Sequence, residues 1–414
     1  MFLLIDAHGN NLILLLCVPR SGSSLATVML QNHTKIFATQ EMWFLMSLYD
    51  LQKSKQSRPY GGAGIIHQFF NGIVSDEVFE HACRAFSRQI YNGLLQGSGG
   101  AEMVVDKSPR YYYLLEFLDK LFPQSKRIWL LRNPLSILAS YKKAESYMDC
   151  KMNFADNLLN PQFNIKMADL TVGLFRYYHY FASNHPNSYR LYYEQLVTNP
   201  KEEMMKLCAF LGITYEEDLD KYGDHMNTPK SDLFYSMGVG DPFLAQHTEP
   251  HRDSIHSWKD TLDKKETELY CRILGARLFH ELGYHAELEE AEKWTGVRFD
   301  SEPDLDLIQF RTKQLTDASG CSWEENYQMK VPNVDAIAND HQTIPISSNY
   351  EVIQLQTTLR SIEKRLENSY IEQRRLRKQL DSLRNKINRF KSIIPFGNRL
   401  TNWASDYLNH RGRK

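Results

Sequence analysis

Cysteine is scarce in this sequence, and no two cysteines form the CxxC pair that zinc sites and redox motifs use. The 414 residues contain six cysteines, which are scattered along the chain. Several of them lie inside apolar stretches, so we expect reduced thiols in the protein core and neither disulfides nor a bound metal. Three histidines of a late polar segment, His247, His251 and His256, also lack the spacing of a metal site.

Long apolar runs are absent as well. No stretch approaches the roughly 20 apolar residues that are needed to cross a bilayer. The amino terminus starts with apolar residues, but it has no basic n-region and is interrupted by Asp6 and Asn10, so it does not match a signal peptide. The net charge of −1 does not point to any class of partner. We therefore expect a cytoplasmic protein with no transmembrane segment and no nucleic-acid partner.

Short apolar stretches alternate with helical patterns from the start of the chain to about residue 290. Strands are expected at residues 12–18, 103–105, 127–131 and 189–193. Helices are expected at residues 78–95, 111–122, 135–143, 169–183, 202–211 and 264–282. This alternation predicts βαβ units and therefore an α/β fold with a parallel sheet flanked by helices. Residues 224–255 show no periodicity and are interpreted as a long loop.

The end of the chain has a different pattern. Between residues 355 and 394, twelve positions follow alternating steps of four and three, and ten of them are apolar. This is the heptad pattern of a coiled coil, in which Ser369 and Gln373 interrupt the apolar seam. Residues 374–391 also carry eight basic side chains and one acidic side chain, which we interpret as a solvated helix face, with contact to an anionic surface as the alternative. We expect the coil to join copies of the chain into a homo-oligomer, with docking onto its own domain as the alternative.

These patterns divide the chain into four parts. We expect a domain of residues 1–295, a linker or extension of residues 296–349, a coiled coil of residues 350–395 and a basic tail of residues 396–414.

The first expected strand ends abruptly in a small polar loop. The apolar run of residues 12–18 is typical of a strand buried on both faces, and Pro19-Arg20-Ser21-Gly22-Ser23-Ser24 follows it directly. In a parallel sheet this loop lies at the carboxyl edge, where such sheets bind ligands. A helical pattern begins at Ser24. A strand, a polar loop and a helix start together predict an anion site made of backbone N–H groups and the helix dipole.

The loop is not a Walker motif. A P-loop nucleotidase has a lysine between its last glycine and the hydroxyl residue, whereas here the cation, Arg20, precedes the glycine. No Walker-B pattern accompanies it. The loop is therefore predicted to bind phosphate-like oxygens without hydrolysing a nucleoside triphosphate.

A second strand ends in the same way. Residues 128–141 are again an apolar strand followed by a cation and a helix, with Arg132 at the strand end and Ser140 two turns further along. A guanidinium and a hydroxyl at these positions could bind a second phosphate.

Together, the two strand ends resemble the sulfotransferase family that uses 3′-phosphoadenosine 5′-phosphosulfate (PAPS). The stretch PRSGSSL is similar to the family's 5′-phosphosulfate loop, and LLRNPLSILASY is similar to its 3′-phosphate motif. Residues 191–213 resemble a later signature in which Tyr193 borders the nucleotide, and Lys107 occupies the place of a central-strand lysine. The resemblance covers roughly residues 10–285, with the four motifs in family order. It implies the P-loop-like α/β fold of the sulfotransferases, followed here by an α-helical coiled coil.

The resemblance implies the transfer of a sulfuryl group from PAPS to an acceptor hydroxyl, on a carbohydrate, a peptide, a lipid or another small molecule. No metal is required, because Arg20 and Lys107 supply positive charge beside the leaving phosphate. The remaining donor contacts implied are the N–H groups and hydroxyls of the loop and the later motif residues: Ser21, Gly22, Ser23, Ser24, Arg132, Ser140 and Tyr193.

The acceptor also needs a base. The cytosolic branch of the family uses a histidine just after the lysine, but Ser108 and Pro109 follow Lys107 here. The tyrosylprotein branch and some bacterial branches use a glutamate about two dozen residues after the phosphate loop, and Glu41 lies 21 residues beyond Arg20. The resemblance therefore implies that Glu41 is the base, while an ordinary helix-start glutamate is the alternative.

Residues 251–259 resemble the family's late loop, which ends in Trp-Lys, although the family's glycines are missing here. The resemblance implies that Arg252 reaches the 3′-phosphate and that Trp258 packs beside the nucleotide. His251 and His256 of this loop are the alternative bases.

Two other functions are compatible with parts of the sequence. One is a nucleotide-dependent kinase, which the missing Walker lysine disfavours. The other is a non-catalytic scaffold that senses the nucleotide and acts through its coiled coil, which the presence of both cationic and acidic site residues disfavours.

Overall fold

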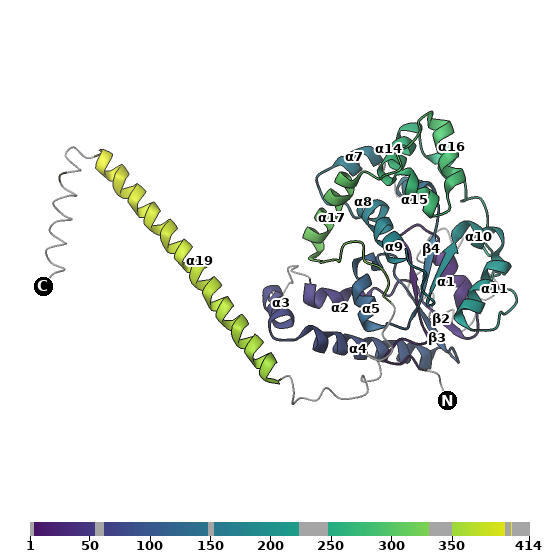
Figure 1. Cartoon of the computed structure of the whole chain (residues 1–414), viewed down its shortest axis with the longest axis horizontal. Helices are drawn as coiled ribbons and strands as arrows, with labels where there is room; N and C mark the ends of the chain where they lie inside the picture. Colours follow the sequence, from purple (N-terminus) through teal and green to yellow (C-terminus); the bar gives the residue numbers. More distant parts are fainter. Residues whose placement is uncertain are drawn as a thin grey trace. The chain divides into compact units, whose positions relative to one another are not determined.

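The computed structural model describes residues 4–53, 62–147, 153–222, 247–330, 350–393 and 399. The chain divides into two compact units, residues 1–343 and residues 344–414, which are described separately below. The first unit contains an open sheet with helices around it, and the described part of the second unit is one long helix (Figure 1).

The sheet has five parallel strands in the order β2-β3-β1-β4-β5. The strands are β1 (Leu12–Leu16), β2 (Ile36–Ala38), β3 (Met103–Lys107), β4 (Lys126–Leu131) and β5 (Ser188–Tyr192). The four strands expected from the sequence are confirmed, and so is the parallel sheet. The three-residue strand β2 was not expected, because so short a run has no periodicity to detect.

Helices connect the strands and cover both faces of the sheet (Figure 1). The helices of the first half are α1 (Ser23–Asn32), α2 (Phe44–Lys53), α3 (Ala63–Gly72), α4 (Asp76–Gly97), α5 (Leu115–Leu121), α6 (Pro134–Tyr147), α7 (Phe154–Leu159), α8 (Ile165–Ala168) and α9 (Leu174–Tyr180). The later ones are α10 (Tyr193–Thr198), α11 (Pro200–Leu211), α13 (Trp258–Thr261), α14 (Lys264–Leu274), α15 (Ala276–Glu281), α16 (His285–Thr295), α17 (Leu305–Ser319) and α19 (Tyr350–Ile393). A 3-10 turn, Tyr111–Tyr113, precedes α5, and a π-helical turn, Asp169–Gly173, precedes α9.

The expected helix at residues 264–282 is divided into α14 and α15. Gly275 lies between them with a φ of 72°, and a Cβ atom there would lie 2.6 Å from the backbone of Ser301 and Pro303. The close approach of a second segment therefore ends the helix, and only glycine fits this position without strain.

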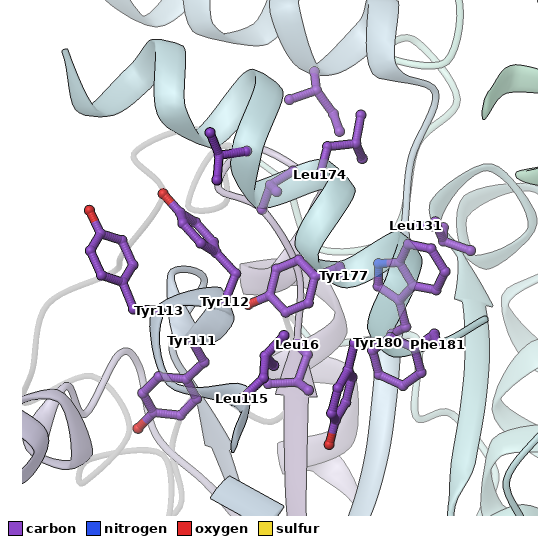
Figure 2. Packing of buried hydrophobic residues seen from close by; sticks show 14 of the residues in the cluster. Leu16, Tyr111, Tyr112, Tyr113, Leu115, Leu131, Leu174, Tyr177, Tyr180 and Phe181 are labelled. Atoms are coloured by element: carbon purple, nitrogen blue, oxygen red, sulfur yellow. The ribbon is translucent and has the colours of Figure 1, made fainter. Parts of the chain in front are cut away.

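Two apolar layers enclose the sheet. Leu12, Leu14 and Leu16 of β1 belong to one buried cluster, while Ile13 and Leu15 belong to the other. Successive side chains of a strand point to opposite faces, which explains why the whole run is apolar. Figure 2 shows part of the first layer, in which aromatic rings from the 3-10 turn and from α9 gather beside the strands.

The packed unit continues beyond the boundary expected at residue 295. The segment expected as a linker contains α17, and Leu315, Tyr327 and Met329 are buried in the main core. Residues 297–330 are therefore packed against the rest of the first unit, as an extension would be and a linker would not. Residues 331–349 and the tail from residue 400 lie outside the described residues.

The expected long helix is present as α19, which has 44 residues. Across the part of the chain that the structure describes, no helix combines the length and the apolar character needed to cross a membrane. The five described cysteines are free and buried, as expected, and Cys150 lies outside the described residues.

Candidate functional site

The two polar strand ends lie side by side, because β1 and β4 are neighbours in the sheet. Arg132, which follows β4, donates from Nη1 to the carbonyl oxygen of Arg20 at 2.9 Å. Arg20 in turn donates from Nε to Oγ of Ser140 at 3.2 Å. Side chains from two motifs more than 100 positions apart in the sequence therefore form one cluster, as the shared sheet edge predicted.

The loop after β1 has the backbone shape of an anion site. Arg20 and Gly22 have φ values of 72° and 91°, and Gly22 is the residue that precedes α1. Ser21 and Ser23 are buried, and the Ser21 hydroxyl has no hydrogen-bond partner among the described residues. Left-handed residues in such a turn aim consecutive N–H groups into one concavity, next to the positive end of the α1 dipole.

A cavity of about 320 Å³ opens between these loops. Six of the predicted site residues line it: Arg20, Gly22, Ser24, Arg132, Ser140 and Tyr193. The other lining residues that carry polar or charged side chains are Lys143, Tyr222, His247, His251, Ser254 and Ser257. The cavity thus has several cations and hydroxyls on its walls.

Arg132 is a buried cation whose two bonded acceptors are neutral. It donates to the carbonyl oxygens of Arg20 and Ser254, both at 2.9 Å, and its guanidinium carbon lies 4.4 Å from the centre of the Tyr193 ring. Burial lowers the pKa of Arg132 from its ordinary value, while Tyr193 and Glu194 raise it. Its Nε is buried and has no partner among the described residues. An anion in the cavity would satisfy this donor.

The late loop contributes differently from the prediction. Arg252 is exposed and donates to the carbonyl oxygen of Thr198 at 2.8 Å, and Trp258 is buried against Trp294. Neither residue lines the cavity, so the structure does not support the contacts expected for them. The loop instead presents the Ser254 carbonyl to Arg132 and places His251 in the wall. Residues 223–246, the larger part of the expected long loop, lie outside the described residues.

A second polar cluster lies on the other side of β1, where β3 and β2 end. Nζ of Lys107 is 3.2 Å from Oε1 of Glu41, and Nε1 of Trp43 donates to Oε2 of the same carboxylate at 2.9 Å. Lys107 has an exposed fraction of 0%, whereas the Glu41 side chain is 32% exposed. The fully buried Lys107 amine therefore holds the Glu41 carboxylate at a position that solvent can reach. Neither residue lines the 320 Å³ cavity.

A buried aspartate, Asp106, precedes Lys107 on β3. Asp106 accepts hydrogen bonds from the hydroxyls of Tyr91 and Tyr111, at 2.6 Å and 2.9 Å. Burial raises the pKa of Asp106 to about 6, although both hydroxyls and the charge of Lys107 lower it. These bonds fix the end of β3, from which the Lys107 side chain extends.

A second buried carboxylate, Asp169, was not expected from the sequence. It accepts a bidentate bond from Arg110, and the hydroxyls of Tyr112 and Tyr141 also donate to it. Burial raises its pKa, and the bond from Arg110 lowers it. The Arg110 guanidinium carbon in turn lies 6.0 Å from the Trp43 ring centre. This network supports Trp43 and, through it, the Glu41 carboxylate.

Within the described ranges, no three His, Cys, Asp or Glu side chains are grouped so as to hold a metal ion. The rings of His247 and His251 lie with their centroids 3.9 Å apart, and Oδ2 of Asp253 is 3.5 Å from Nδ1 of His251, but these described side chains are not grouped as a ligand set.

Gly22 allows a test of the loop geometry. A Cβ atom at Gly22 would lie 2.3 Å from Cδ2 of Tyr193, and its φ of 91° disfavours any other residue. We expect Gly22→Ala to lower the free energy of unfolding by about 1–2 kcal/mol or more, through backbone strain and displacement of the Tyr193 ring. Urea denaturation measures this change.

Gly93→Ala is the matched control, because Gly93 lies within α4 with open space around its Cα. This variant should be neutral or stabilising. Equal stability of the two variants would contradict the close contact between the loop and Tyr193.

Comparisons with known proteins agree with this geometry. The model of the sulfotransferase family matches residues 13–217. The nodulation protein NoeE of Sinorhizobium fredii is 28% identical over 293 residues, which are 67% of this chain and 67% of that protein. Protein-tyrosine sulfotransferase 2 of Gallus gallus is 24% identical over 225 residues, covering 51% of this chain and only 54% of that protein.

Among solved structures, the sulfotransferase domain from the Synechococcus PCC 7002 olefin synthase aligns with a TM-score of 0.41 and 21% identity. The alignment covers 61% of this chain and 88% of that domain.

Proposed function

The chain belongs to the sulfotransferase family, and on this premise we propose that it transfers a sulfuryl group from PAPS to an acceptor hydroxyl. The observation that carries the choice of donor is the cavity between the two strand-end loops. A nucleotide with phosphates at both its 3′ and 5′ positions needs two anion sites, and both loops supply cations and hydroxyls to this one cavity.

Two orphaned polar atoms support the fit of such a donor. Nε of Arg132 and Oγ of Ser21 are buried without partners among the described residues, and each could donate a hydrogen bond to a phosphate oxygen. In our proposal the loop residues Arg20 to Ser24 hold the 5′ end, and Arg132 with Ser140 holds the 3′-phosphate. The donor supplies the sulfuryl group and a bisphosphate leaving group.

The acceptor side is assigned to the Glu41–Lys107 pair. As the acceptor oxygen forms its bond to sulfur, the bond between sulfur and the 5′-phosphate oxygen breaks, and the proton of the acceptor hydroxyl goes to Glu41. Arg20 lines the cavity and faces the negative charge that grows on the leaving phosphate, whereas Lys107 lies outside the cavity wall and has to turn toward it. Lys107 must then exchange part of its contact with Glu41 for the phosphate, which also frees Oε1 to accept the proton.

The acceptor itself is proposed only as a hydroxyl compound, on a carbohydrate, a peptide, a lipid or another small molecule. The Gallus gallus relative is named for protein tyrosine, and the Sinorhizobium fredii relative is named for nodulation, so the two names do not indicate a common acceptor. A screen with radiolabelled donor across these classes identifies it. We also propose a cytoplasmic location, since the described cysteines are free thiols.

Nucleotide affinity tests the donor assignment. We expect adenosine 3′,5′-bisphosphate to bind more tightly than AMP or ATP in the presence of EDTA, because only the bisphosphate reaches both loops. Arg132→Ala should remove most of this preference, at a cost of about 10- to 100-fold in bisphosphate affinity, as expected for a charge-assisted bond. Isothermal titration calorimetry measures both.

The control is Arg272→Ala, which removes an exposed arginine that pairs with Glu268 on the surface of α14. Its affinities should equal those of the wild type. Equal binding of AMP and bisphosphate by the wild type would contradict the 3′-phosphate assignment, and preferential ATP binding would favour the kinase alternative.

A further inference from the structure

The long helix of the second unit has a row of exposed apolar side chains, which no other described residue of that unit covers. The row runs along one side of α19, and its members are between 50% and 57% exposed. They are Leu359, Ile362, Leu366, Leu376, Leu380, Leu383 and Ile387. Ser369 and Gln373 continue the same row at its middle, and both are exposed. We call these nine residues the α19 seam.

We propose that the α19 seam pairs with the α19 seam of a second copy of this chain, and that the two helices run antiparallel, centred on residue 371. This inference is independent of the proposed reaction. The regular steps of four and three mean that two such helices can wind around each other with their seams in continuous contact.

The order of residues in the seam fits an antiparallel pair. With the centre at residue 371, Leu359 faces the partner's Leu383, and Ile362 faces the partner's Leu380. Leu366 then faces the partner's Leu376. In the middle, Ser369 faces the partner's Gln373, twice by symmetry, so that a hydroxyl and an amide can form a hydrogen bond. In every apolar layer, both helices therefore contribute an apolar residue. In each of the two polar layers, the serine of one helix and the glutamine of the other satisfy each other's hydrogen-bonding groups.

In a parallel pair each seam residue would face the same residue of the partner, so the seam alone does not determine the direction of the helices. The distribution of charge does. Residues 351–372 carry four acidic and three basic side chains, a net charge of −1. Residues 373–393 carry eight basic side chains and one acidic one, a net charge of +7. A parallel pair places two +7 segments side by side. An antiparallel pair places each +7 segment against a segment of −1, which removes most of the repulsion between the helices.

Individual charges beside the seam agree with this direction. Glu363 follows Ile362, and Arg377 follows Leu376, so in the antiparallel pair Glu363 lies next to the partner's Arg377. Tyr370 lies next to its own symmetry copy near the centre, where two rings can pack. The cost is the approach of the two Glu372 carboxylates, each of which has Arg375 of its own helix at 3.9 Å. This partner screens part of the repulsion.

The direction has a consequence for the assembly. A helix of 44 residues is about 66 Å long. In an antiparallel pair the two chains therefore begin α19 at opposite ends, about 60 Å apart, whereas in a parallel pair both begin at the same end.

Spin labels on the full chain distinguish the two directions. Ser382 precedes Leu383 on the side of the helix that points away from the seam, and we expect Ser382→Cys labels in an antiparallel dimer to be separated by about 33 Å along the helix axis, or 22 residues. In a parallel dimer they would be less than about 20 Å apart, because adjacent helix axes lie about 10 Å apart. Tyr370→Cys labels, near the centre, should be close together. Both variants carry Cys150→Ser, since the five described cysteines are buried.

Pulsed dipolar spectroscopy gives these distances, and light scattering gives the mass. A dimer mass with a long distance at residue 382 and a short one at residue 370 supports the proposal. Short distances at both residues mean a parallel pair and overturn it. A monomer mass, which would mean that α19 packs on its own domain or on nothing, overturns it as well, and so does a trimer or tetramer.

Charge reversal gives a second test that does not depend on labels. Glu363→Lys should weaken association about 5-fold, and Arg377→Glu in the same chain should restore it, because the two residues meet across the antiparallel pair. Glu372→Lys combined with Arg377→Glu is the matched comparison, since these two residues face each other only in a parallel pair. Rescue by the second combination and not by the first would overturn the antiparallel direction.

Discussion

Replacement of Glu41 by glutamine is expected to lower kcat about 10²–10⁴-fold and to leave the affinity for adenosine 3′,5′-bisphosphate unchanged. Glutamine keeps the shape of the side chain and can still accept the bond from Nε1 of Trp43, but it cannot take a proton from the acceptor. Glu41 does not line the nucleotide cavity, so binding and turnover should separate. Steady-state rates with an identified acceptor, together with calorimetry, measure the two quantities.

Loss of the Glu41 charge also changes stability, and this effect must be measured independently. Lys107 is fully buried and pairs with Glu41 at 3.2 Å, so Glu41→Gln leaves a buried amine without its counter-charge. We expect a lower melting temperature, and bisphosphate should raise it by the same amount as in the wild type, because its affinity is unchanged. Glu102→Gln is the control: Glu102 pairs with Lys35 at the surface, next to the start of β3.

The pH dependence distinguishes a base from a residue that only supports the fold. The acidic limb of the pH–rate profile should flatten in Glu41→Gln when chemistry limits the rate, and it should be retained in Glu102→Gln. Full activity of Glu41→Gln would move the base elsewhere. His251 would then be the next candidate, since burial and the neighbouring His247 lower its pKa and keep its ring neutral.

The sheet and the position of the main site could be read from the sequence because a buried parallel strand leaves a continuous apolar run. Leu12 to Leu16 gives such a run on both of its faces, and the polar residues after it must lie at the carboxyl edge. The order of the strands left no such signal. It is the placement of β1 between β3 and β4 that brings Arg132 to one side of the phosphate loop and Lys107 to the other.

The late loop is the part of the expected site that resembles the family least. The sequence there lacks the family's glycines, and the structure turns Arg252 toward Thr198 instead of the cavity. The contact that does reach Arg132 comes from the Ser254 carbonyl. Every residue has a carbonyl, so no side-chain pattern could have indicated this contact.

The contacts that support Glu41 also left no signal in the sequence, for a different reason. Trp43 lies two residues after Glu41, where the sequence offers only an aromatic residue at a helix start. Its bond to the carboxylate depends on the positive φ of 59° at Trp43 and on the Arg110–Asp169 pair, which joins segments 59 residues apart. Contacts of this kind follow from the packing of helices on the sheet and leave no periodic trace.

Replacement of Arg20 by alanine is the second large effect we expect, with kcat reduced about 10²–10³-fold. Arg20 lines the cavity and donates to Ser140, and our proposal places its charge beside the leaving phosphate. The Arg20 carbonyl is held independently by Arg132 at 2.9 Å. A φ of 72° is as unfavourable for alanine as it is for arginine, so the substitution adds no backbone strain and the loop should keep its shape.

The effect of Arg20→Ala should be larger on turnover than on bisphosphate affinity, because the charge on the leaving oxygen is greatest in the transition state. Arg20→Lys keeps a positive charge but loses the planar donor that reaches Ser140, so we expect it to recover part of the rate. We would measure rates, affinities and melting temperatures of both variants, with Arg272→Ala as the surface control. These measurements show whether Arg20 stabilises the leaving group or contributes binding alone. If Arg20→Ala keeps full turnover, this loop does not stabilise the leaving group, and sulfuryl transfer at this cavity is contradicted. If turnover and affinity fall equally in both Arg20 variants while the melting temperature is unchanged, Arg20 contributes binding alone, and Lys107 carries the charge stabilisation.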